Sequence, residues 1–324
     1  MHNYEQLVED FEKQLHQIEY NNKPIELYSP IKYTLGFGGK RIRPVTTLMG
    51  CELFCDDYEK AMSQAIAIEL FHNFTLIHDD IMDNAPIRRG KETVFKKWNS
   101  NIAILSGDTL FALAYQYAQL ADKDILHKTL TVFSQTAIEV CEGQQFDLNY
   151  EINNNVTVDE YINMIRLKTG VLFGASLKIG ALIGGAPCED ADLLYDFGVN
   201  IGLGFQLKDD LLDTFGNENI FGKKTGGDII TNKKTFLYLK ALEIADNQTK
   251  EELILLYNSP DINEENKIKL AKSIFSKLKV DDAANIEIDK FFIAGIKCLD
   301  KINVDNKKKE YLREVAVKMI NRNK

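Results

Sequence analysis

Apolar residues recur every three or four positions along most of the chain, which is the period of an α-helix with one buried face. Alternation of apolar and polar residues, which marks a half-buried strand, is nearly absent. From about residue 262 onward the chain is rich in charged residues but keeps apolar residues at helical spacing. The pattern predicts helices over residues 4–20, 42–55, 60–82, 101–121, 124–145, 158–184, 190–213, 233–257 and 264–278.

Within two of these segments, residues 66–78 and 102–120 are apolar nearly all round, as the central helices of a large bundle are. A chain of 324 residues is long enough for two domains, but it holds only 6 prolines and no linker rich in Gly and Ser. We therefore expect an all-α fold, a single domain over residues 1–324 with roughly ten or more helices around one core.

Composition and charge narrow the range of functions. The net charge of −9 argues against a nucleic-acid partner, since such proteins carry a basic face. Cys51 and Cys55 lie four residues apart but have no second Cys or His pair to complete a zinc site, so we expect the 5 cysteines to be free thiols in a reducing compartment. The sequence contains neither a signal-peptide pattern nor a run of 18 apolar residues, and we expect a cytoplasmic location.

Two acidic motifs of the form DDxxD interrupt apolar helical segments. They are Asp79-Asp80-Ile81-Met82-Asp83 and Asp209-Asp210-Leu211-Leu212-Asp213. Positions three and four apart are neighbours on a helix, so each motif gathers its carboxylates into one patch. One such motif alone would as readily be a solvated acidic face. The apolar residues around both motifs favour the alternative that these carboxylates hold a hard cation such as Mg²⁺.

Basic clusters occur close to both motifs and in glycine-containing segments. They include the loop of Lys40, Arg41 and Arg43, the pair Arg88-Arg89, and a segment from Lys223 to Lys233. Any one of these could be a solvated surface cluster. Together, in a chain with net negative charge, they predict sites for phosphate groups, because arginine and lysine are the side chains that bind them.

These residues stand in blocks that resemble the trans-polyprenyl diphosphate synthase family over about residues 36 to 236. Glu92 and Phe95 depart from the family pattern beside the site, which leaves details of substrate choice open. The matching blocks are Gly39–Pro44, Leu76–Asp83, Arg88–Gly90, Leu105–Asp108, Gly143–Leu148, Lys168–Phe173, Gly204–Asp210 and Gly222-Lys223.

The resemblance implies a helical bundle of the isoprenoid synthase type with a central active-site cavity. It also implies Mg²⁺-dependent condensation of isopentenyl diphosphate with an allylic diphosphate by head-to-tail chain elongation. Three Mg²⁺ ions are expected, with Asp79, Asp83 and Asp209 as direct ligands and Asp80, Asp210 and Asp213 as supporting ones. Isopentenyl diphosphate would be bound by Lys40, Arg43, His72 and Arg89, and the allylic diphosphate by Arg88, Lys168, Lys223 and Lys233. Thr169 and Gln206 would lie beside the reacting carbon.

His72 also allows a plainer interpretation, a core histidine whose nitrogens are satisfied locally. It lies seven residues before Asp79, however, roughly 20° from it around a helix at ~100° per residue, and so faces the same side. The implied chemistry needs cations because diphosphate leaves an allylic carbon only when its charge is neutralised. Apolar helices around the motifs would exclude water from the resulting carbocation.

Product length is expected to depend on Phe74 and Thr75, one turn before the first motif. An aromatic residue there resembles enzymes that make C15 or C20 products, with C20 slightly favoured, although Phe74 could equally be ordinary core. A longer-chain synthase is the alternative. A homodimer packed through helices such as 102–120 is also expected from the resemblance, although that helix could instead be buried within one subunit.

Three other classes of protein fit the sequence less well. A terpene cyclase generally lacks the second DDxxD motif and needs no isopentenyl site. A non-catalytic subunit of a heteromeric synthase usually loses site residues that are all present here. A helical scaffold would leave the basic clusters without a role.

Overall fold

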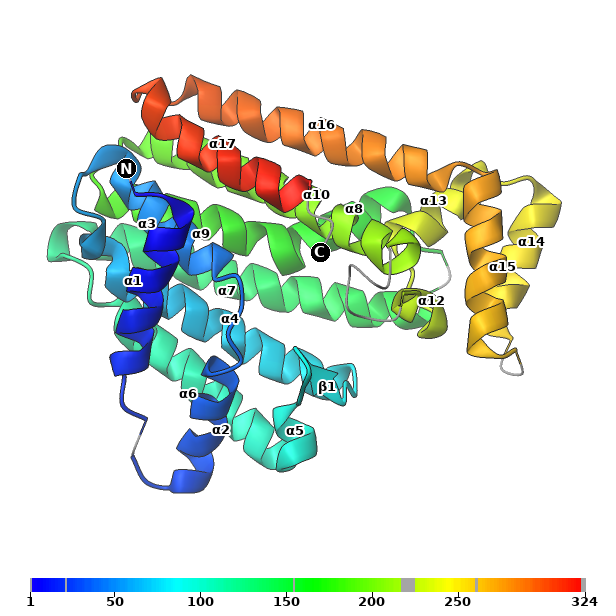
Figure 1. Cartoon of the computed structure of the whole chain (residues 1–324), viewed down its shortest axis with the longest axis horizontal. Helices are drawn as coiled ribbons and strands as arrows, with labels where there is room; N and C mark the ends of the chain where they lie inside the picture. Colours follow the sequence, from blue (N-terminus) through cyan, green and yellow to red (C-terminus); the bar gives the residue numbers. More distant parts are fainter. Residues whose placement is uncertain (1, 21, 154, 217–224, 260–261, 322–324) are drawn as a thin grey trace. The chain divides into compact units, whose positions relative to one another are not determined.

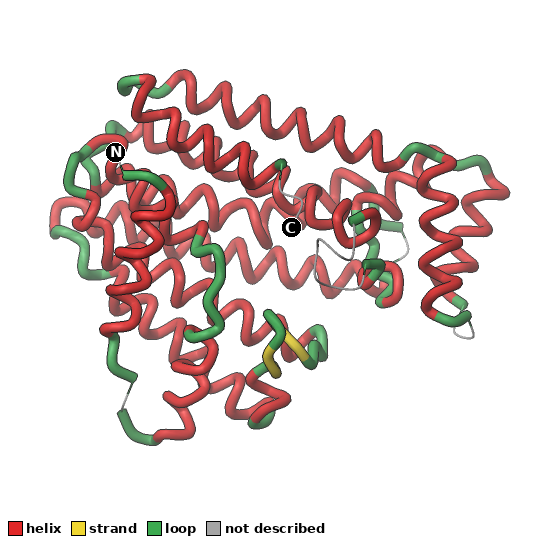
Figure 2. Tube along the Cα trace, viewed as in Figure 1, coloured by secondary structure: helices red, strands yellow, loops and turns green. Residues whose placement is uncertain are grey.

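The computed structural model describes residues 2–20, 22–153, 155–216, 225–259 and 262–321. Its elements are almost entirely helical (Figures 1 and 2), and the all-α prediction is confirmed. The sole sheet in these ranges is a hairpin of two short strands, β1 (Ile87–Arg88) and β2 (Lys91–Glu92). Among the described helices, none is both long enough and apolar enough to cross a bilayer.

The chain divides into two compact units, which are described separately. The first comprises residues 1–134, 175–194 and 303–312, and the second comprises residues 135–174, 195–302 and 313–324. Several long helices contribute residues to both units: α7 (Lys123–Ile152), α9 (Val171–Ile183), α10 (Cys188–Phe215) and α17 (Asn306–Ile320). The single domain over residues 1–324 stays a prediction.

The first unit is built around α4 (Met62–Met82), which packs against α6 (Ser100–Ala118) and α3 (Ile42–Phe54). α4 is buried over its first half, Gln64–Phe71, where six of the eight side chains are apolar, and buried polar residues such as Glu69 lie among them. The other elements of this unit are α1 (Tyr4–Gln17), α2 (Ile25–Leu35), the 3₁₀ turn η1 (Tyr58–Ala61) and α5 (Val94–Lys97).

Close backbone contact joins α3 to α9 in the same unit. A Cβ atom added to Gly180 would lie 1.9 Å from the carbonyl oxygen of Thr47, so only glycine allows this approach.

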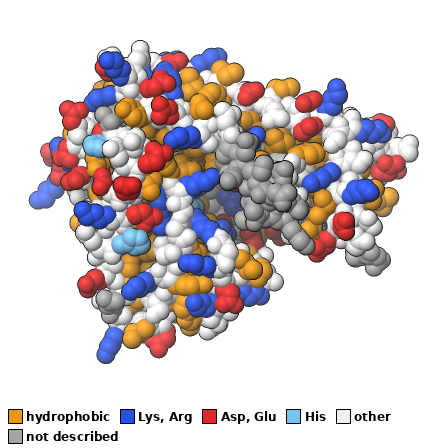
Figure 3. Space-filling model, viewed as in Figure 1, with side chains coloured by type: hydrophobic (Ala, Val, Ile, Leu, Met, Phe, Trp, Pro, Cys, Tyr) orange, Lys and Arg blue, Asp and Glu red, His pale blue; other side chains and the backbone are white. Residues whose placement is uncertain are grey.

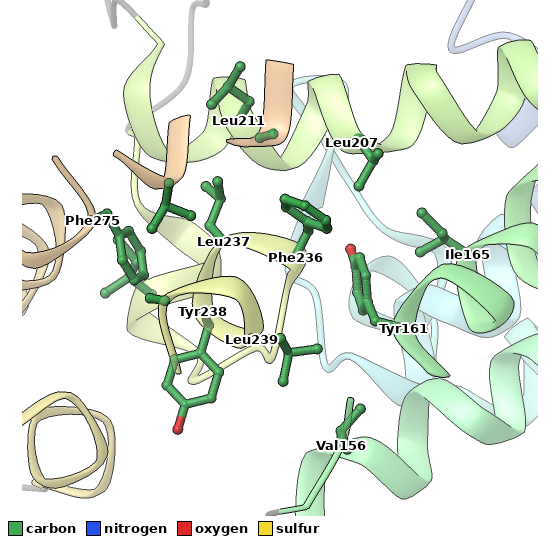
Figure 4. Close-up of a cluster of buried hydrophobic side chains, with 14 of the residues drawn as sticks. Val156, Tyr161, Ile165, Leu207, Leu211, Phe236, Leu237, Tyr238, Leu239 and Phe275 are labelled. Atoms are coloured by element: carbon green, nitrogen blue, oxygen red, sulfur yellow. The ribbon is translucent and has the colours of Figure 1, made fainter. Parts of the chain in front are cut away.

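The second unit has its own apolar core (Figure 4). Tyr161 comes from α8 (Val158–Ile165), Leu207 from α10, and Leu237 from α13 (Phe236–Ile244). Phe275 of α15 (Glu264–Lys277) also belongs to it. The remaining elements are a π-helical turn η2 (Arg166–Gly170), α12 (Gly227–Ile230), α14 (Asn247–Asn258) and α16 (Val280–Lys301).

The structure differs from the predicted elements in several details. α2 was missed because Pro30 lies inside it, but burial of Ile31 and Leu35 against α6 offsets the lost hydrogen bond. The segment 158–184 is interrupted by the π turn, and 233–257 is two helices because Asp246 caps the start of α14. The hairpin at 87–92 was missed because two-residue strands carry no periodicity.

Candidate active site

The first acidic motif occupies the C-terminal end of α4. Asp80 is buried and accepts a hydrogen bond from Nε of Arg88 at 2.7 Å, whereas Asp79 is partly exposed and Asp83 is exposed. Burial raises the pKa of Asp80 even though Arg88 acts to lower it. The C-terminal end of a helix carries partial negative charge, so three carboxylates there favour a cation over an anion.

The Arg88-Arg89-Gly90 segment forms the turn of the β1–β2 hairpin. Arg89 and Gly90 have φ angles of 52° and 75°, which is the left-handed pair that a two-residue type I′ hairpin needs. This turn lets Arg88 reach back to Asp80, while Arg89 donates a hydrogen bond to the carbonyl oxygen of Gly38. One tight turn therefore links the acidic motif to the glycine-containing loop.

A cationic group lies in the same unit around His72. Nη1 of Arg43 is 3.2 Å from Nε2 of His72. Arginine has no acceptor, so Nε2 accepts this hydrogen bond and His72 is the neutral tautomer with its proton on Nδ1. Burial lowers the pKa of His72 well below its usual value, and Arg43, Arg89 and Arg88 lower it further. Burial likewise lowers the pKa of Arg43 to about 10. This concentration of positive charge suits an anionic ligand.

The second acidic motif lies in the last turns of α10, in the second unit. Asp210 is buried and accepts hydrogen bonds from the Tyr161 hydroxyl at 2.5 Å and from Nε2 of Gln206 at 3.1 Å. Asp213 accepts the backbone N–H of Asp228 at 3.0 Å. Burial, followed by the charge of Asp228, raises the pKa of Asp210 to about 8. The carboxylates here carry more negative charge than their buried surroundings stabilise, and a bound cation would relieve this.

Lys168 and Thr169 are placed by the π turn η2. Nζ of Lys168 lies 2.6 Å from Oδ2 of Asp147, and Nζ of Lys233 lies 3.8 Å from the same atom. Burial of Asp147 acts to raise its pKa, but Lys233 and Lys168 lower it on balance. Thr169 donates its hydroxyl hydrogen to Oε1 of Gln206 at 3.3 Å, so a chain of hydrogen bonds runs from Thr169 through Gln206 to Asp210.

The candidate metal ligands of both acidic motifs fit Mg²⁺ in their chemistry, since each of them is a carboxylate. Within the described residues, no three acidic, His or Cys side chains are arranged so that they could hold a metal ion by themselves. Mg²⁺ is commonly held by one or two carboxylates together with substrate phosphates and water, which needs no such protein cage.

The sequence reasoning gave no role to four residues that the structure connects to the site. Asp147 forms ion pairs with Lys168 and Lys233, and the Tyr161 hydroxyl donates a hydrogen bond to Asp210. The backbone N–H of Asp228 donates a hydrogen bond to Asp213. Glu69 forms an ion pair with Arg41 at 2.5 Å. Asp147 and Asp228 stand in or beside the matching sequence blocks, which was the available signal. Tyr161 and Glu69 read as core positions in their helices. Lys223 lies outside the described residues.

Phe74 packs in an aromatic cluster of the first unit. Its ring stacks on Phe111 with centroids 4.9 Å apart and meets His78 edge-on at 4.7 Å, while Phe71 lies 5.6 Å away. Thr75 donates its hydroxyl hydrogen to the backbone carbonyl oxygen of His72 at 2.8 Å. Phe74 is therefore part of a packed cluster and is also partly exposed.

Because the folded-state pKa of His72 lies below that of the unfolded chain, the unfolded chain binds more protons between those two values. The contribution of His72 to the free energy of unfolding is therefore present above about pH 6.5 and falls as the pH drops. We expect the difference in unfolding free energy between the natural protein and His72→Gln to decrease from pH 7 to pH 5, by at most about 1.4 kcal/mol per pH unit. Urea unfolding at both pH values measures it. A difference that stays constant would mean that His72 is not held neutral.

Comparison with known proteins identifies the family. The sequence profile of the family described as Polyprenyl synthetase matches residues 24–275. The chain is 41% identical over 247 residues to the short chain isoprenyl diphosphate synthase of Methanocaldococcus jannaschii, covering 76% of this chain and 75% of that protein. It is 37% identical over 239 residues to the geranylfarnesyl diphosphate synthase of Natronomonas pharaonis, covering 68% and 70%.

A crystal structure of a geranylgeranyl pyrophosphate synthase has the same fold. It superposes with a TM-score of 0.95 at 41% identity, covering 99% of both chains, which confirms the isoprenoid synthase fold. Members of the family typically depend on Mg²⁺, and their substrates are isopentenyl diphosphate and an allylic diphosphate. The chain therefore belongs to the polyprenyl synthetase family and is a prenyltransferase of isoprenoid biosynthesis, a polyprenyl diphosphate synthase.

Proposed function

We propose that this enzyme joins isopentenyl diphosphate to an allylic diphosphate by 1′-4 elongation, releases diphosphate, and makes a C15 to C20 product. The observation that carries the proposal is the cationic group around Arg43 and His72 in the same unit as the first aspartate motif. Such a group serves to hold a diphosphate. A terpene cyclase has no use for it, because it takes no isopentenyl diphosphate.

The basic side chains are assigned to the two diphosphates, and the acidic side chains are assigned to Mg²⁺. Arg43, with neutral His72 as its acceptor, is fixed in direction before any ligand arrives, and Lys40 and Arg89 are assigned to the same diphosphate. Arg88, Lys168, Lys223 and Lys233 are assigned to the allylic diphosphate. Mg²⁺, when bound, would neutralise the charge that develops on the leaving diphosphate, and we assign three ions to the aspartates of both motifs.

Thr169 and Gln206 are assigned to the carbocation. The side-chain amide of Gln206 is held from both ends, by the Thr169 hydroxyl and by Asp210. The hydroxyl oxygen of Thr169 and the amide oxygen of Gln206 are thus oriented in advance and can stabilise positive charge without reorganising.

The reaction is tested by incubating the purified protein with isopentenyl diphosphate and each allylic primer, with Mg²⁺ or with excess chelator. We expect condensation only with Mg²⁺, and we expect Asp79→Asn and Asp209→Asn each to lower kcat by about a hundredfold or more, since each removes a charged group at the site of diphosphate departure. Asp10→Asn, a carboxylate of α1 outside the site, is the matched control. No condensation with any primer would contradict the proposal and favour a non-catalytic subunit.

Product length is the finer part of the proposal, with C20 slightly favoured and a longer chain as the alternative. The geranylgeranyl pyrophosphate synthase among the similar proteins supports C20, whereas the geranylfarnesyl diphosphate synthase is named for a C25 product and supports the alternative. We expect Phe74→Ala to lengthen the product by one or more C5 units, because it removes a ring from the turn before Asp79. Chromatography of the dephosphorylated products measures this. Phe133→Leu, in the same aromatic cluster, is the control, and an unchanged length in Phe74→Ala would make Phe74 ordinary core.

A homodimer in the cytoplasm completes the proposal. On α6, Ile104 is 42% and Leu105 is 57% exposed, which is unusual for adjacent apolar side chains and suits an interface with a second copy. The described cysteines are free, in keeping with a reducing compartment. We expect light scattering to give twice the chain mass of 36.9 kDa and Leu105→Glu to shift it toward one chain. A single-chain mass for the natural protein would refute the dimer.

The charge distribution agrees with small anionic substrates. On the face shown in Figure 3, both acidic and basic side chains are present. This supports diphosphates held by local basic groups and gives no support to a nucleic-acid partner.

A further inference from the structure

Arg41, the last residue before α3, differs from the two cations near it in sequence, Lys40 and Arg43. Its side chain is only 1% exposed, whereas Lys40 is exposed. Nε donates to Oε1 of Glu12 at 2.7 Å, Nη1 to Oε1 of Glu69 at 2.5 Å, and Nη2 to the carbonyl oxygen of Leu35 at 2.9 Å. All three nitrogens of the guanidinium group are engaged inside the protein, so Arg41 is an internal anchor and not a ligand for substrate.

The backbone at Arg41 shows what is being anchored. Its φ of 50° is in the left-handed region, which is unfavourable for a residue other than glycine. Burial acts to lower the pKa of Arg41, but Glu69 and Glu12 raise it on balance, so the charge is retained. These ion pairs hold a backbone bend that leaves Lys40 exposed and places Arg43 on the first turn of α3, within reach of His72.

Half of this anchor comes from α1, which precedes the family match at residues 24–275. Glu12 binds Arg41, and the hydroxyl of Tyr4 donates a hydrogen bond to the carbonyl oxygen of Lys40. α1 also has an attachment that does not involve the loop, since Asp10 accepts the Tyr58 hydroxyl at 2.7 Å. The two attachments can therefore be removed separately.

We propose that Glu12 is a positioning residue for isopentenyl diphosphate: through Arg41 it fixes the loop that presents Lys40 and Arg43 to the diphosphate group. The inference rests on the proposed function for its ligand, and on the first unit alone for its geometry. This role makes α1 part of the substrate site, and loss of the Glu12 side chain should then affect only one of the two substrates.

The test compares Glu12→Ala, Glu12→Gln and Asp10→Ala in the full chain. Glutamine keeps an acceptor for Arg41 but loses the charge, so its effect should be intermediate. We expect Glu12→Ala to raise KM for isopentenyl diphosphate about three- to tenfold, as expected for loss of a charge-assisted hydrogen bond, while KM for the allylic primer and kcat stay nearly unchanged. Asp10→Ala, which loosens α1 at η1, should leave all three constants close to those of the natural protein.

Hydrogen exchange supplies a readout that does not need turnover. The backbone amides of residues 36–43 should exchange faster in Glu12→Ala than in Asp10→Ala. If the natural protein shows no condensation, the proposed function fails while this comparison still decides the anchoring role of Glu12. Equal effects of Glu12→Ala and Asp10→Ala, or a Glu12→Ala protein with unchanged exchange and KM, would overturn the inference.

Discussion

The site depends on one constraint: carboxylates buried among apolar helices need protein partners that offset their negative charge. Asp80, Asp210, Asp147 and Glu69 are all buried or nearly so, and a buried carboxylate is costly unless something offsets its charge. Each has found a different partner: Arg88, the Tyr161 hydroxyl, two lysines and Arg41, respectively. The remaining aspartates of the motifs are the more exposed ones. Protein groups thus contact each inner carboxylate, whereas the direct Mg²⁺ ligands that we propose, Asp79, Asp83 and Asp209, belong to the more exposed set.

The same logic applies to the cations. Arg43 lies near His72, and burial, followed by the positive charges around the imidazole, lowers the pKa of His72 and keeps it neutral. A neutral histidine can accept a hydrogen bond from arginine, whereas a protonated one would repel it. Arg41, between Lys40 and Arg43 in sequence, is neutralised by two carboxylates and has a structural part. Neighbouring basic residues therefore differ: Arg41 is paired inside the protein, whereas Lys40 and Arg43 are the residues that we propose for the diphosphate.

Local backbone geometry does as much as charge to position these groups. The type I′ turn at Arg89-Gly90 directs Arg88 and Arg89 to two different partners. The π turn η2 sets Lys168 and Thr169 toward Asp147 and Gln206, and close approach of η2 to Gly143 leaves no room for a side chain there. Such turns cost conformational energy, and the hydrogen bonds they enable help to offset it.

The sequence by itself determined the helical class, the two aspartate motifs and the central helices, because a 3.6-residue period and a repeated DDxxD spacing are local features of the chain. It placed the helices at 42–54 and 100–118 within a few residues of their ends. It could not find α2, the 87–92 hairpin or the π turn, whose stability comes from distant contacts and not from local preference. The family resemblance assigned different roles to Arg41 and Arg43 and to Asp80 and Asp79, but the local pattern could not show that Arg41 and Asp80 are the buried members. Only tertiary structure decided which of two adjacent like charges is buried with a partner, because that depends on residues such as Glu12 and Glu69, 29 and 28 positions from Arg41.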